Sequence, residues 1–328
     1  MDFSHFTVQK DDDGKRIDKI VRVILKNHNL GGIFGAIRKG FILLDEKKCR
    51  QDTKVKEGSV ISVATFLIEK NDEKTKKSTV QKTKIGSELE KLVIFRNEHI
   101  LFLNKPYGIP VQPSKTHPHS LLELILEDFE KNGSKSISFK PGPLHRLDER
   151  TTGIVAYSQS LFGARVFSEA IQSGKIKKMY LALLEGNLKN ECVWTDEIKK
   201  NEDSSKKFKT VQIDFGGKKS TTRVIPVLSG IVNGKKATLS RVFIETGRTH
   251  QIRAQCALHG FPLLGDSAYG SKCTPFSKER EFFLHAQTLF LEEIAEKLKT
   301  PPSLSADVPN EIEKILENAF GKSLIENR

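Results

Sequence analysis

The sequence lacks the features that mark membrane-spanning, exported and zinc-binding proteins. It contains no stretch of roughly 18 consecutive apolar residues, so no membrane span is expected. The first residues, MDFSHFTVQKDDDGK, hold an acidic triplet and no apolar core, which argues against a secretory signal. Four cysteines without a C-x-x-C pair argue against a disulfide framework and a structural zinc site, and Cys256 is expected to be a small core residue. We therefore expect a cytoplasmic protein that holds no metal.

Positive charge, in contrast, is abundant and unevenly distributed. Lys and Arg number 54 against 41 Asp and Glu, a formal net charge of +13. Residues 1–88 hold 19 of the basic and 13 of the acidic residues, which makes this segment more than twice as basic per residue as the rest. Such a surface attracts a polyanion, and the alternative is a basic surface that only keeps the protein in solution.

Residues 15–27 have the clearest helical periodicity in the basic segment. Apolar residues recur at the spacing of one helical face, at Ile17, Ile20, Val21, Ile24 and Leu25. Basic residues follow a second face, at Lys15, Lys19, Arg22 and Lys26. Such a helix can dock on a core and present its cations outward. Gly31-Gly32 is expected to break it, before a short helix that Gly40 stops and strands at 41–44 and 60–63.

The rest of the chain combines strands with inserted helices. Residues 69–88 are strongly charged, which predicts a flexible linker. Strands are expected at 92–95, 100–103, 177–184, 207–215, 222–228 and 237–245. Helices are expected after a capping box of Ser120 and Glu123, at 160–173 and at 309–320. This order indicates an α+β fold with a mixed, mainly antiparallel sheet and flanking helices, next to a small N-terminal α/β domain.

His145-Arg146-Leu147-Asp148 is the most informative stretch of the chain. It follows Pro141-Gly142-Pro143, which interrupts regular structure, and it precedes a buried strand expected at 153–157. Asp148 therefore lies on a loop just before a rigid element, where catalytic residues are often found. Taken alone, such an aspartate is more often a turn residue or a helix cap.

Three further motifs follow in the second half of the chain: Lys178-Met-Tyr180-Leu-Ala182, Thr246-Gly-Arg-Thr-His-Gln-Ile-Arg253 and Gly265-Asp-Ser-Ala-Tyr-Gly270. In this order the four motifs resemble those of the RluA-type RNA pseudouridine synthases, over residues 90–290. The chain departs from the family at Thr152, where serine is usual, and around Gln255, where a histidine often follows the arginine by two residues.

The resemblance also implies a domain organisation. Residues 14–64 resemble the small RNA-binding domain that many of these synthases share with a ribosomal small-subunit protein of the S4 type. We accordingly expect an S4-like RNA-binding domain at 1–68, the linker at 69–88, a catalytic domain with the pseudouridine synthase fold at 89–308 and a helical tail at 309–328.

The family reaction converts uridine in RNA to pseudouridine. It breaks the bond between C1′ and N1, rotates the uracil and joins C5 to C1′, and because no redox change occurs and no group is donated, no cofactor is expected. The resemblance makes Asp148 the nucleophile, Arg253 its charged partner and Tyr180 the aromatic side chain against the uracil. A guanidinium near the carboxylate would lower its pKa and keep it ionised.

Basic residues outside the chemistry are expected to hold the RNA. By family analogy, Arg146 fills the space that a flipped uridine leaves. Phosphate contacts are expected from Arg248, His250, Lys15, Lys19, Arg22 and Lys26. The S4-like domain favours large-subunit ribosomal RNA as the substrate of a monomeric enzyme, and a synthase acting on tRNA is the alternative.

Two other functions use parts of the same sequence. A catalytically silent RNA-binding or ribosome-assembly protein would share the basic surfaces, but it would not need to keep Asp148, Tyr180 and Arg253. A phosphotransferase is suggested by a faint similarity of the first motif to a kinase catalytic loop. That loop needs the acid directly after His-Arg, where this sequence has Leu147.

Overall fold

The computed structural model describes residues 1–69, 85–113, 119–132, 136–200, 211–213, 217–272 and 281–321. Contacts divide the chain into two units. The N-terminal unit consists of Met1–Lys91, Leu124–Gly142 and Ser158–Ala164, and the C-terminal unit of Leu92–Glu123, Pro143–Tyr157 and Arg165–Arg328. The expected linker lies mostly outside the described residues, and its last positions belong to helix α4 (Ile85–Glu90). No helix in the described ranges is both long and apolar enough to cross a membrane.

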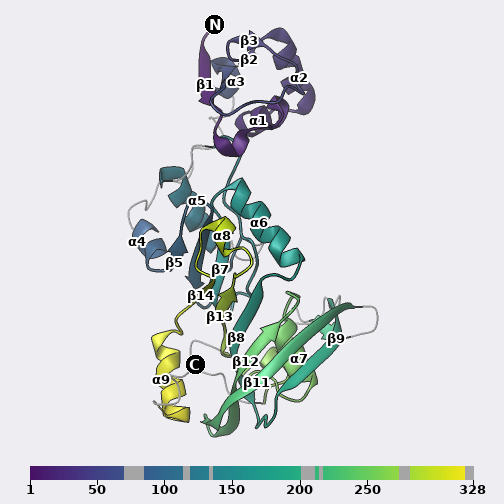
Figure 1. Ribbon diagram of the computed structural model, residues 1–328, viewed down its shortest axis with the longest axis vertical. Coiled ribbons are helices and arrows are strands. Elements are labelled where there is room, and N and C mark those ends of the chain that lie inside the picture. The colour runs from purple at the N-terminus through teal and green to yellow at the C-terminus, as the bar shows by residue number, and fades with distance from the viewer. Residues whose placement is uncertain are drawn as a thin grey trace. The chain divides into compact units, whose positions relative to one another are not determined.

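A small antiparallel sheet forms the centre of the N-terminal unit, with short helices beside it (Figure 1). The strand order is β1-β4-β2-β3. The strands are β1 (Phe3–Thr7), β2 (Ile42–Leu44), β3 (Lys47–Lys48) and β4 (Val60–Ala64). The helices are α1 (Ile17–Ile24), α2 (Leu30–Lys39) and α3 (Thr65–Glu69). The strands expected at 41–44 and 60–63 are confirmed, whereas β1 was not predicted because its residues are short of apolar side chains and only partly buried.

The apolar face of α1 belongs to the core, as its periodicity predicts. Ile17, Ile20, Val21 and Leu25 are completely buried in one cluster with side chains of α2 and β4. The glycine pair does not act as expected, because α1 ends before it. Asn29 caps α2 by accepting a hydrogen bond of 2.8 Å from the Gly32 N–H, so both glycines lie in the first turn of that helix.

Fewer basic side chains face outward along α1 than the sequence predicts. Lys19 and Arg22 lie on α1 with exposed side chains, and Lys26 is exposed just beyond its end. Lys15 precedes the helix and donates a hydrogen bond of 2.8 Å from Nζ to Ser138 Oγ. Lys15 is therefore not part of an outward-facing stripe, because a hydroxyl of the same unit holds its ammonium group.

Asp12 ties the beginning of the chain to residues 136–138 within the N-terminal unit. Its side chain has no exposed surface. It accepts hydrogen bonds of 2.5–3.0 Å from the hydroxyl groups of Ser136 and Ser138 and from the backbone N–H groups of Ile137 and Ser138. Ile137 also packs against the apolar cluster around α1. The limits of this unit therefore differ from the expected domain boundaries.

A ten-stranded sheet dominates the described part of the C-terminal unit, in the order β10-β9-β11-β12-β8-β13-β7-β6-β5 with β14 beside β13. β13 runs parallel to β7, whereas the pairs β9–β10, β9–β11, β11–β12, β8–β12, β8–β13, β13–β14 and β5–β6 are antiparallel. The expected α+β fold with a mixed, mainly antiparallel sheet is confirmed. The strands are β5 (Val93–Arg96), β6 (Ile100–Lys105), β7 (Thr152–Ser158), β8 (Lys177–Glu185), β9 (Cys192–Lys200), β10 (Val211–Ile213), β11 (Lys218–Val232), β12 (Lys235–Ile244), β13 (Leu284–Phe290) and β14 (Ser303–Ser305). The other residues of the strand expected at 207–215 lie outside the described ranges.

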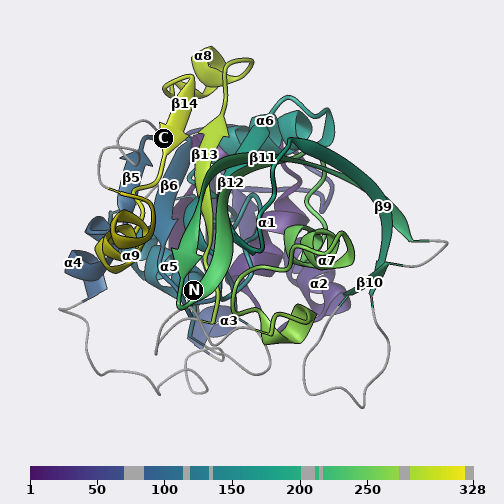
Figure 2. The same ribbon diagram turned by 90° about the horizontal axis from the view of Figure 1, so that it is seen from below.

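The helices expected after Ser120, at 160–173 and at 309–320 are present as α5 (Leu121–Asn132), α6 (Leu161–Gln172) and α9 (Asn310–Phe320). The C-terminal unit also contains α7 (Gln251–Leu258) and the short α8 (Ala295–Leu298). The long strands β9, β11 and β12 curve around α7, which contacts β9, β10 and β11 (Figure 2). The capping box of α5 is half formed: the Ser120 N–H donates to Glu123 Oε2 at 3.1 Å, while Ser120 Oγ has no hydrogen-bond partner among the described residues.

Gln255 fastens α7 to the curved strands. Its buried amide donates to Trp194 O and to Asp196 Oδ2, and its oxygen accepts a hydrogen bond of 2.6 Å from the Thr222 hydroxyl. Asp196 Oδ2 also lies 3.1 Å from Nε2 of His259, whose ring stacks on Trp194 with centroids 4.6 Å apart. The departure from the family pattern at Gln255 thus has a structural role in this chain.

Candidate active site

The loop that carries Asp148 is held at both ends. Before it, the Leu144 N–H donates to Ala156 O at 2.8 Å, and His145 Nε2 accepts a hydrogen bond of 3.1 Å from the Ala156 N–H. After it, the Thr151 N–H donates to Asp148 O at 3.0 Å and closes a turn that leads into β7. The expected position of Asp148, in a loop directly before a buried strand, is confirmed.

A buried lysine supports this loop from behind. Lys105, at the end of β6, has no exposed surface. Its Nζ donates hydrogen bonds to the carbonyl oxygens of Pro106, Ile109 and Glu149, at 2.9, 2.8 and 2.7 Å. An ammonium group buried among carbonyl dipoles is satisfied without a carboxylate. The backbone next to Asp148 is therefore fixed by a residue for which the sequence predicted no role.

The first residues of β7, which follow the Asp148 loop, pack closely against β13. Gly153 has a φ of 109°, and a Cβ built on it would lie 2.2 Å from the Ala286 carbonyl oxygen. Only glycine fits such an approach of β7 to β13. Beside it, Thr152 Oγ1 lies 2.8 Å from Nδ1 of the buried His285. Thr152 therefore uses the hydroxyl group that it shares with the serine usual in the family.

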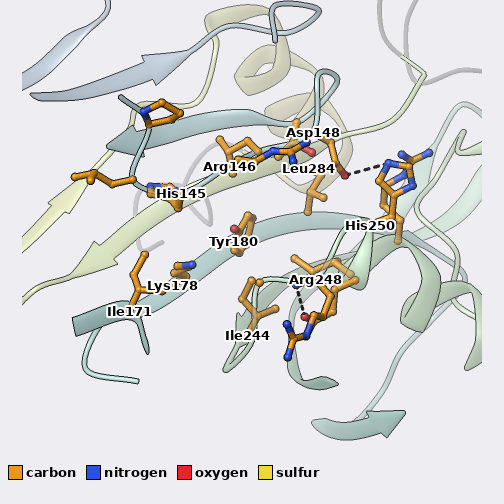
Figure 3. A pocket seen from close by; sticks show the side chains of 18 of the residues that line it. His145, Arg146, Asp148, Ile171, Lys178, Tyr180, Ile244, Arg248, His250 and Leu284 are labelled. Carbon is orange, nitrogen blue, oxygen red and sulfur yellow. Dashed lines mark hydrogen bonds and ion pairs between the residues drawn. The ribbon is translucent and has the colours of Figure 1, made fainter. Parts of the chain in front are cut away.

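Asp148 lies in a pocket of about 490 Å³ within the C-terminal unit, which collects residues of three of the four motifs. The first motif, the strand β8, and the turn before α7 each contribute a wall (Figure 3). Asp148 is the only carboxylate among the described residues that line it; the others are Gln112, Pro143, Leu144, His145, Arg146, Leu147, Thr151, Ile171, Lys178, Tyr180, Ile244, Gly247, Arg248, His250, Gln251, Ile252, Arg253 and Leu284. The side chain of Asp148 keeps 26% of its surface exposed, so a ligand can reach it.

His250 is the charged or polar side chain that the structure places opposite Asp148. Its Nε2 lies 3.8 Å from Asp148 Oδ2, as the dashed line in Figure 3 marks, and its Nδ1 lies 2.9 Å from the Tyr269 hydroxyl. Burial lowers the pKa of His250, although the charges of Asp148 and Asp266 oppose the shift. The expected phosphate contact of His250 stays a prediction, and the structure places its largely buried imidazole beside the carboxylate of Asp148.

Arg253 lies beside the pocket, but its direct partner is not the expected one. Its guanidinium donates two hydrogen bonds to Asp266, from Nε at 2.7 Å and from an Nη at 2.8 Å. Both side chains are buried, and the guanidinium stacks between the rings of Tyr269 and Phe282. Burial opposes the charged form, but Asp266, and to a smaller extent Asp148, raise the pKa of Arg253. The arginine therefore acts on Asp148 through space and joins the third motif to the fourth.

Tyr180 lies on β8 in the middle of the pocket, with 6% of its surface exposed. Burial, and then the negative charge of Asp148, raise the pKa of its hydroxyl above the ordinary value. A phenol that stays protonated at neutral pH is a poor proton acceptor, and its flat ring offers a surface for a planar base. The geometry favours the stacking role over the proton-removing role.

Two further predicted residues, Arg146 and Arg248, have solvent-exposed side chains. Arg146 and Arg248 line the pocket with exposed side chains, so both can reach a backbone that enters it. Lys178 also lines the pocket; it belongs to the second motif, but sequence reasoning gave it no role. The alternation of side chains along a strand could have predicted its place in the pocket, because residues 178 and 180 lie on the same face.

Comparisons with known proteins agree with this geometry. Residues 99–258 match the family of RNA pseudouridylate synthases. The ribosomal large subunit pseudouridine synthase C of Vibrio vulnificus (strain CMCP6) is 28% identical over 316 residues, which covers 95% of each chain. The protein of the same name from Vibrio parahaemolyticus serotype O3:K6 (strain RIMD 2210633) is 29% identical over 266 residues, covering 81% of this chain and 79% of that protein.

Solved structures show the same fold. Human RNA Pseudouridylate Synthase Domain Containing 4 is similar with a TM-score of 0.56 and 19% identity, over 71% of this chain and 95% of the other. Human RNA Pseudouridylate Synthase Domain Containing 1 is similar with a TM-score of 0.52 and 21% identity, over 66% and 82%. The matched segment contains Asp148, Tyr180 and Arg253, which the fold brings to one pocket. The chain is therefore similar to RNA pseudouridine synthases in sequence over residues 99–258 and in fold.

Proposed function

We propose that this protein isomerises uridines of large-subunit ribosomal RNA to pseudouridine. The similar proteins that span nearly the whole chain are named for that substrate, which favours it over tRNA. The observation that carries the catalytic assignment is the position of Asp148, a partly exposed carboxylate in one pocket with a buried tyrosine. A silent RNA-binding protein would have no reason to keep this arrangement.

Asp148 acts as the nucleophile in this proposal. Its carboxylate adds to a carbon of the sugar or the base, the N1–C1′ bond breaks, and the uracil rotates on the enzyme. The C5–C1′ bond then forms as the carboxylate leaves unchanged, C5 gives up its proton to solvent, and N1 takes one up, so that the reaction is a net isomerisation. The imidazole of His250 lies 3.8 Å from the carboxylate and forms one side of the space in which Asp148 acts.

The other pocket residues bind the flipped nucleotide. Extracting a stacked uridine costs about a few kcal/mol, which interactions in the pocket must offset. Tyr180 stacks on the uracil, and Arg146 fills the space left in the RNA. Arg248 binds a backbone phosphate at the rim, where its side chain is exposed. Arg253 and Asp266 hold the wall that supports these interactions.

The first residues of the chain, 1–68, form the S4-like RNA-binding domain in this proposal. Lys19, Arg22 and Lys26 are exposed and bind phosphates. Replacing all three by Met should lower the slope of log affinity against log salt by roughly 0.7–0.9 for each phosphate that is no longer neutralised. Point variants are the sharper tool here, because deleting the segment would also remove Asp12 from residues 136–138.

The decisive experiment uses Asp148→Asn, a nearly isosteric change that removes the nucleophilic charge. Purified wild-type and variant proteins are incubated with a large-subunit ribosomal RNA transcript, and pseudouridines are mapped by chemical adducts and primer extension. The same mapping in RNA from a deletion strain identifies the target. We expect no product from Asp148→Asn, and normal product from the control Glu245→Gln, an exposed acid directly after β12. Turnover by Asp148→Asn would refute the assignment of the nucleophile, and product on tRNA alone would refute the substrate.

A further inference from the structure

Lys178 brings a cation into the pocket for which the described residues provide no counterion. It shares the inward face of β8 with Tyr180, because alternate residues of a strand point the same way. Its Nζ lies beside the turn before α7, where a Cβ built on Gly247 would be 3.6 Å away. No described side chain or backbone carbonyl lies within hydrogen-bonding or ion-pair distance of this ammonium group, and burial lowers its pKa.

His145 adds a second unused donor to the same end of the pocket. Its Nε2 accepts a hydrogen bond from the Ala156 N–H, so the proton of the neutral ring resides on Nδ1. That Nδ1 is buried and has no hydrogen-bond partner among the described residues. Burial, with a smaller contribution from the charge of Lys178, lowers the pKa of His145 to about 3, so the ring is neutral.

The two unused donors lie apart from the reacting carboxylate. Figure 3 shows His145 and Lys178 toward one end of the pocket and Asp148 with His250 toward the other, with Tyr180 between them. A base stacked on Tyr180 would therefore place Asp148 on one side and the two donors on the other. Because the donors lie away from Asp148, they cannot simply serve as its counterion.

We propose that Lys178 and His145 form an oxyanion subsite that binds a phosphate group flanking the target uridine. This inference rests on the proposed function. A partly buried ammonium without a counterion is costly, and an anionic ligand removes that cost. RNA supplies such an anion only as phosphate, whereas the uracil carbonyls are neutral. The Nδ1–H of His145 gives the second hydrogen bond that orients the phosphate.

Direct binding tests the subsite without catalysis. Wild-type protein is titrated with uridine 3′,5′-bisphosphate and with uridine, and the rise in the unfolding midpoint gives each affinity. Lys178→Met keeps the apolar stem and removes the charge; Lys178→Arg keeps the charge; Lys177→Met is the control, since residue 177 is exposed on the other face of β8. We expect Lys178→Met alone to lose about 10- to 100-fold in affinity for the bisphosphate and nothing for uridine, as for one charge-assisted hydrogen bond.

A second experiment locates the phosphate in RNA. A short RNA containing a mapped target uridine is made with a neutral methylphosphonate at either its 5′ or its 3′ linkage. At one linkage the substitution should reduce kcat/KM for wild-type protein, mainly through KM, by about as much as Lys178→Met does, and it should cost that variant nothing more. Equal losses in wild-type and variant proteins at both linkages overturn the subsite, as does unchanged bisphosphate binding by Lys178→Met. If a thio substitution of a uracil carbonyl couples to Lys178 instead, the ligand is the base and the phosphate assignment is wrong.

The outcomes separate the two proposals. Bisphosphate binding that depends on Lys178, in a protein that makes no pseudouridine, would retain the subsite and reject the proposed function. Pseudouridine formation with full activity in Lys178→Met would retain the function and reject the subsite.

Discussion

Each unit contains a fully buried aspartate, and the two are satisfied in different ways. Asp266 in the C-terminal unit faces the guanidinium of Arg253, the one hydrogen-bond partner of its side chain among the described residues. Asp12 in the N-terminal unit is surrounded by hydroxyl and backbone N–H donors of residues 136–138, with Lys15 Nζ no closer than 4.0 Å. Asp266 therefore depends on an oppositely charged side chain, whereas Asp12 depends on residues 136–138 keeping one conformation.

The largest effect is expected from breaking the charged pair. Asp266→Ala leaves the Arg253 guanidinium buried without a counterion, and the free energy of unfolding should fall by about 3–5 kcal/mol. Urea unfolding of the C-terminal unit measures it. The double variant Asp266→Leu with Arg253→Met should lose much less than the sum of the single changes, because it leaves no uncompensated charge. Additive losses would show that the pair is not coupled.

A smaller loss of stability is expected when Asp12 can no longer accept hydrogen bonds from the neutral donors of residues 136–138. Asp12→Ala removes the acceptor but leaves donors that water can reach once the segment opens, so the cost should be about 1–3 kcal/mol. Hydrogen exchange of the amides of α1 measures the effect in the N-terminal unit. Asp52→Ala, at an exposed position of the same unit, should leave that exchange unchanged. Loss of protection in both variants would contradict a specific role for Asp12.

The comparison shows which interactions a sequence reveals. Asp266 stands in a motif that family resemblance marks, and Arg253 stands in the motif before it, only 13 residues away. Asp12 stands in an acidic triplet, and its donors come 124–126 residues later, in a stretch without any distinctive pattern. The spacing of apolar residues predicts the faces of α1, but nothing local indicates which polar groups will meet across such a separation.

Acid should weaken the interactions of Asp12, and the direction of the effect follows from its hydrogen bonds. Burial works against its charge, but hydrogen bonds from Ser138, Ile137 and Ser136 outweigh it and lower the pKa below the ordinary 3.8. Its stabilising effect is therefore fully present above that value and is lost as pH falls through the folded-state pKa. The difference in stability between wild-type protein and Asp12→Asn should shrink as the pH falls below about 4. A difference that grows toward low pH would mean that the folded pKa is raised instead.

The smallest effect on stability is expected from replacing Lys15, whose ammonium group lies near Asp12. Lys15 keeps 26% of its side chain exposed, and its hydrogen bond to Ser138 is partly screened by water. Lys15→Met should therefore cost at most about 1 kcal/mol. A double-mutant cycle with Asp12→Asn measures the coupling of the two side chains. A coupling as large as that of the Arg253–Asp266 pair would show that Asp12 also depends on a charged partner.

The motifs were enough to predict several of the residues that line the active site. They were not enough to predict which side chains bond to each other. The motifs predicted that Asp148, Tyr180 and Arg253 would gather, and they do line one pocket. The sequence could not show that Arg253 bonds to Asp266 rather than to Asp148, because the motifs do not specify which acid the guanidinium meets. Lys105 was missed for a related reason: its partners are backbone carbonyls, which leave no trace in the pattern of side chains.

The stack of Trp194 on His259 gives the protein a built-in optical probe. Trp194 is the single tryptophan of the sequence, and it lies on β9 in the C-terminal unit. Tryptophan emission therefore monitors that unit alone, whereas far-ultraviolet circular dichroism records the helices and strands of both. Unfolding curves from the two signals should superimpose only if the units melt together. A variant that loosens Asp12 should shift the dichroism curve and leave the emission curve in place if they melt separately.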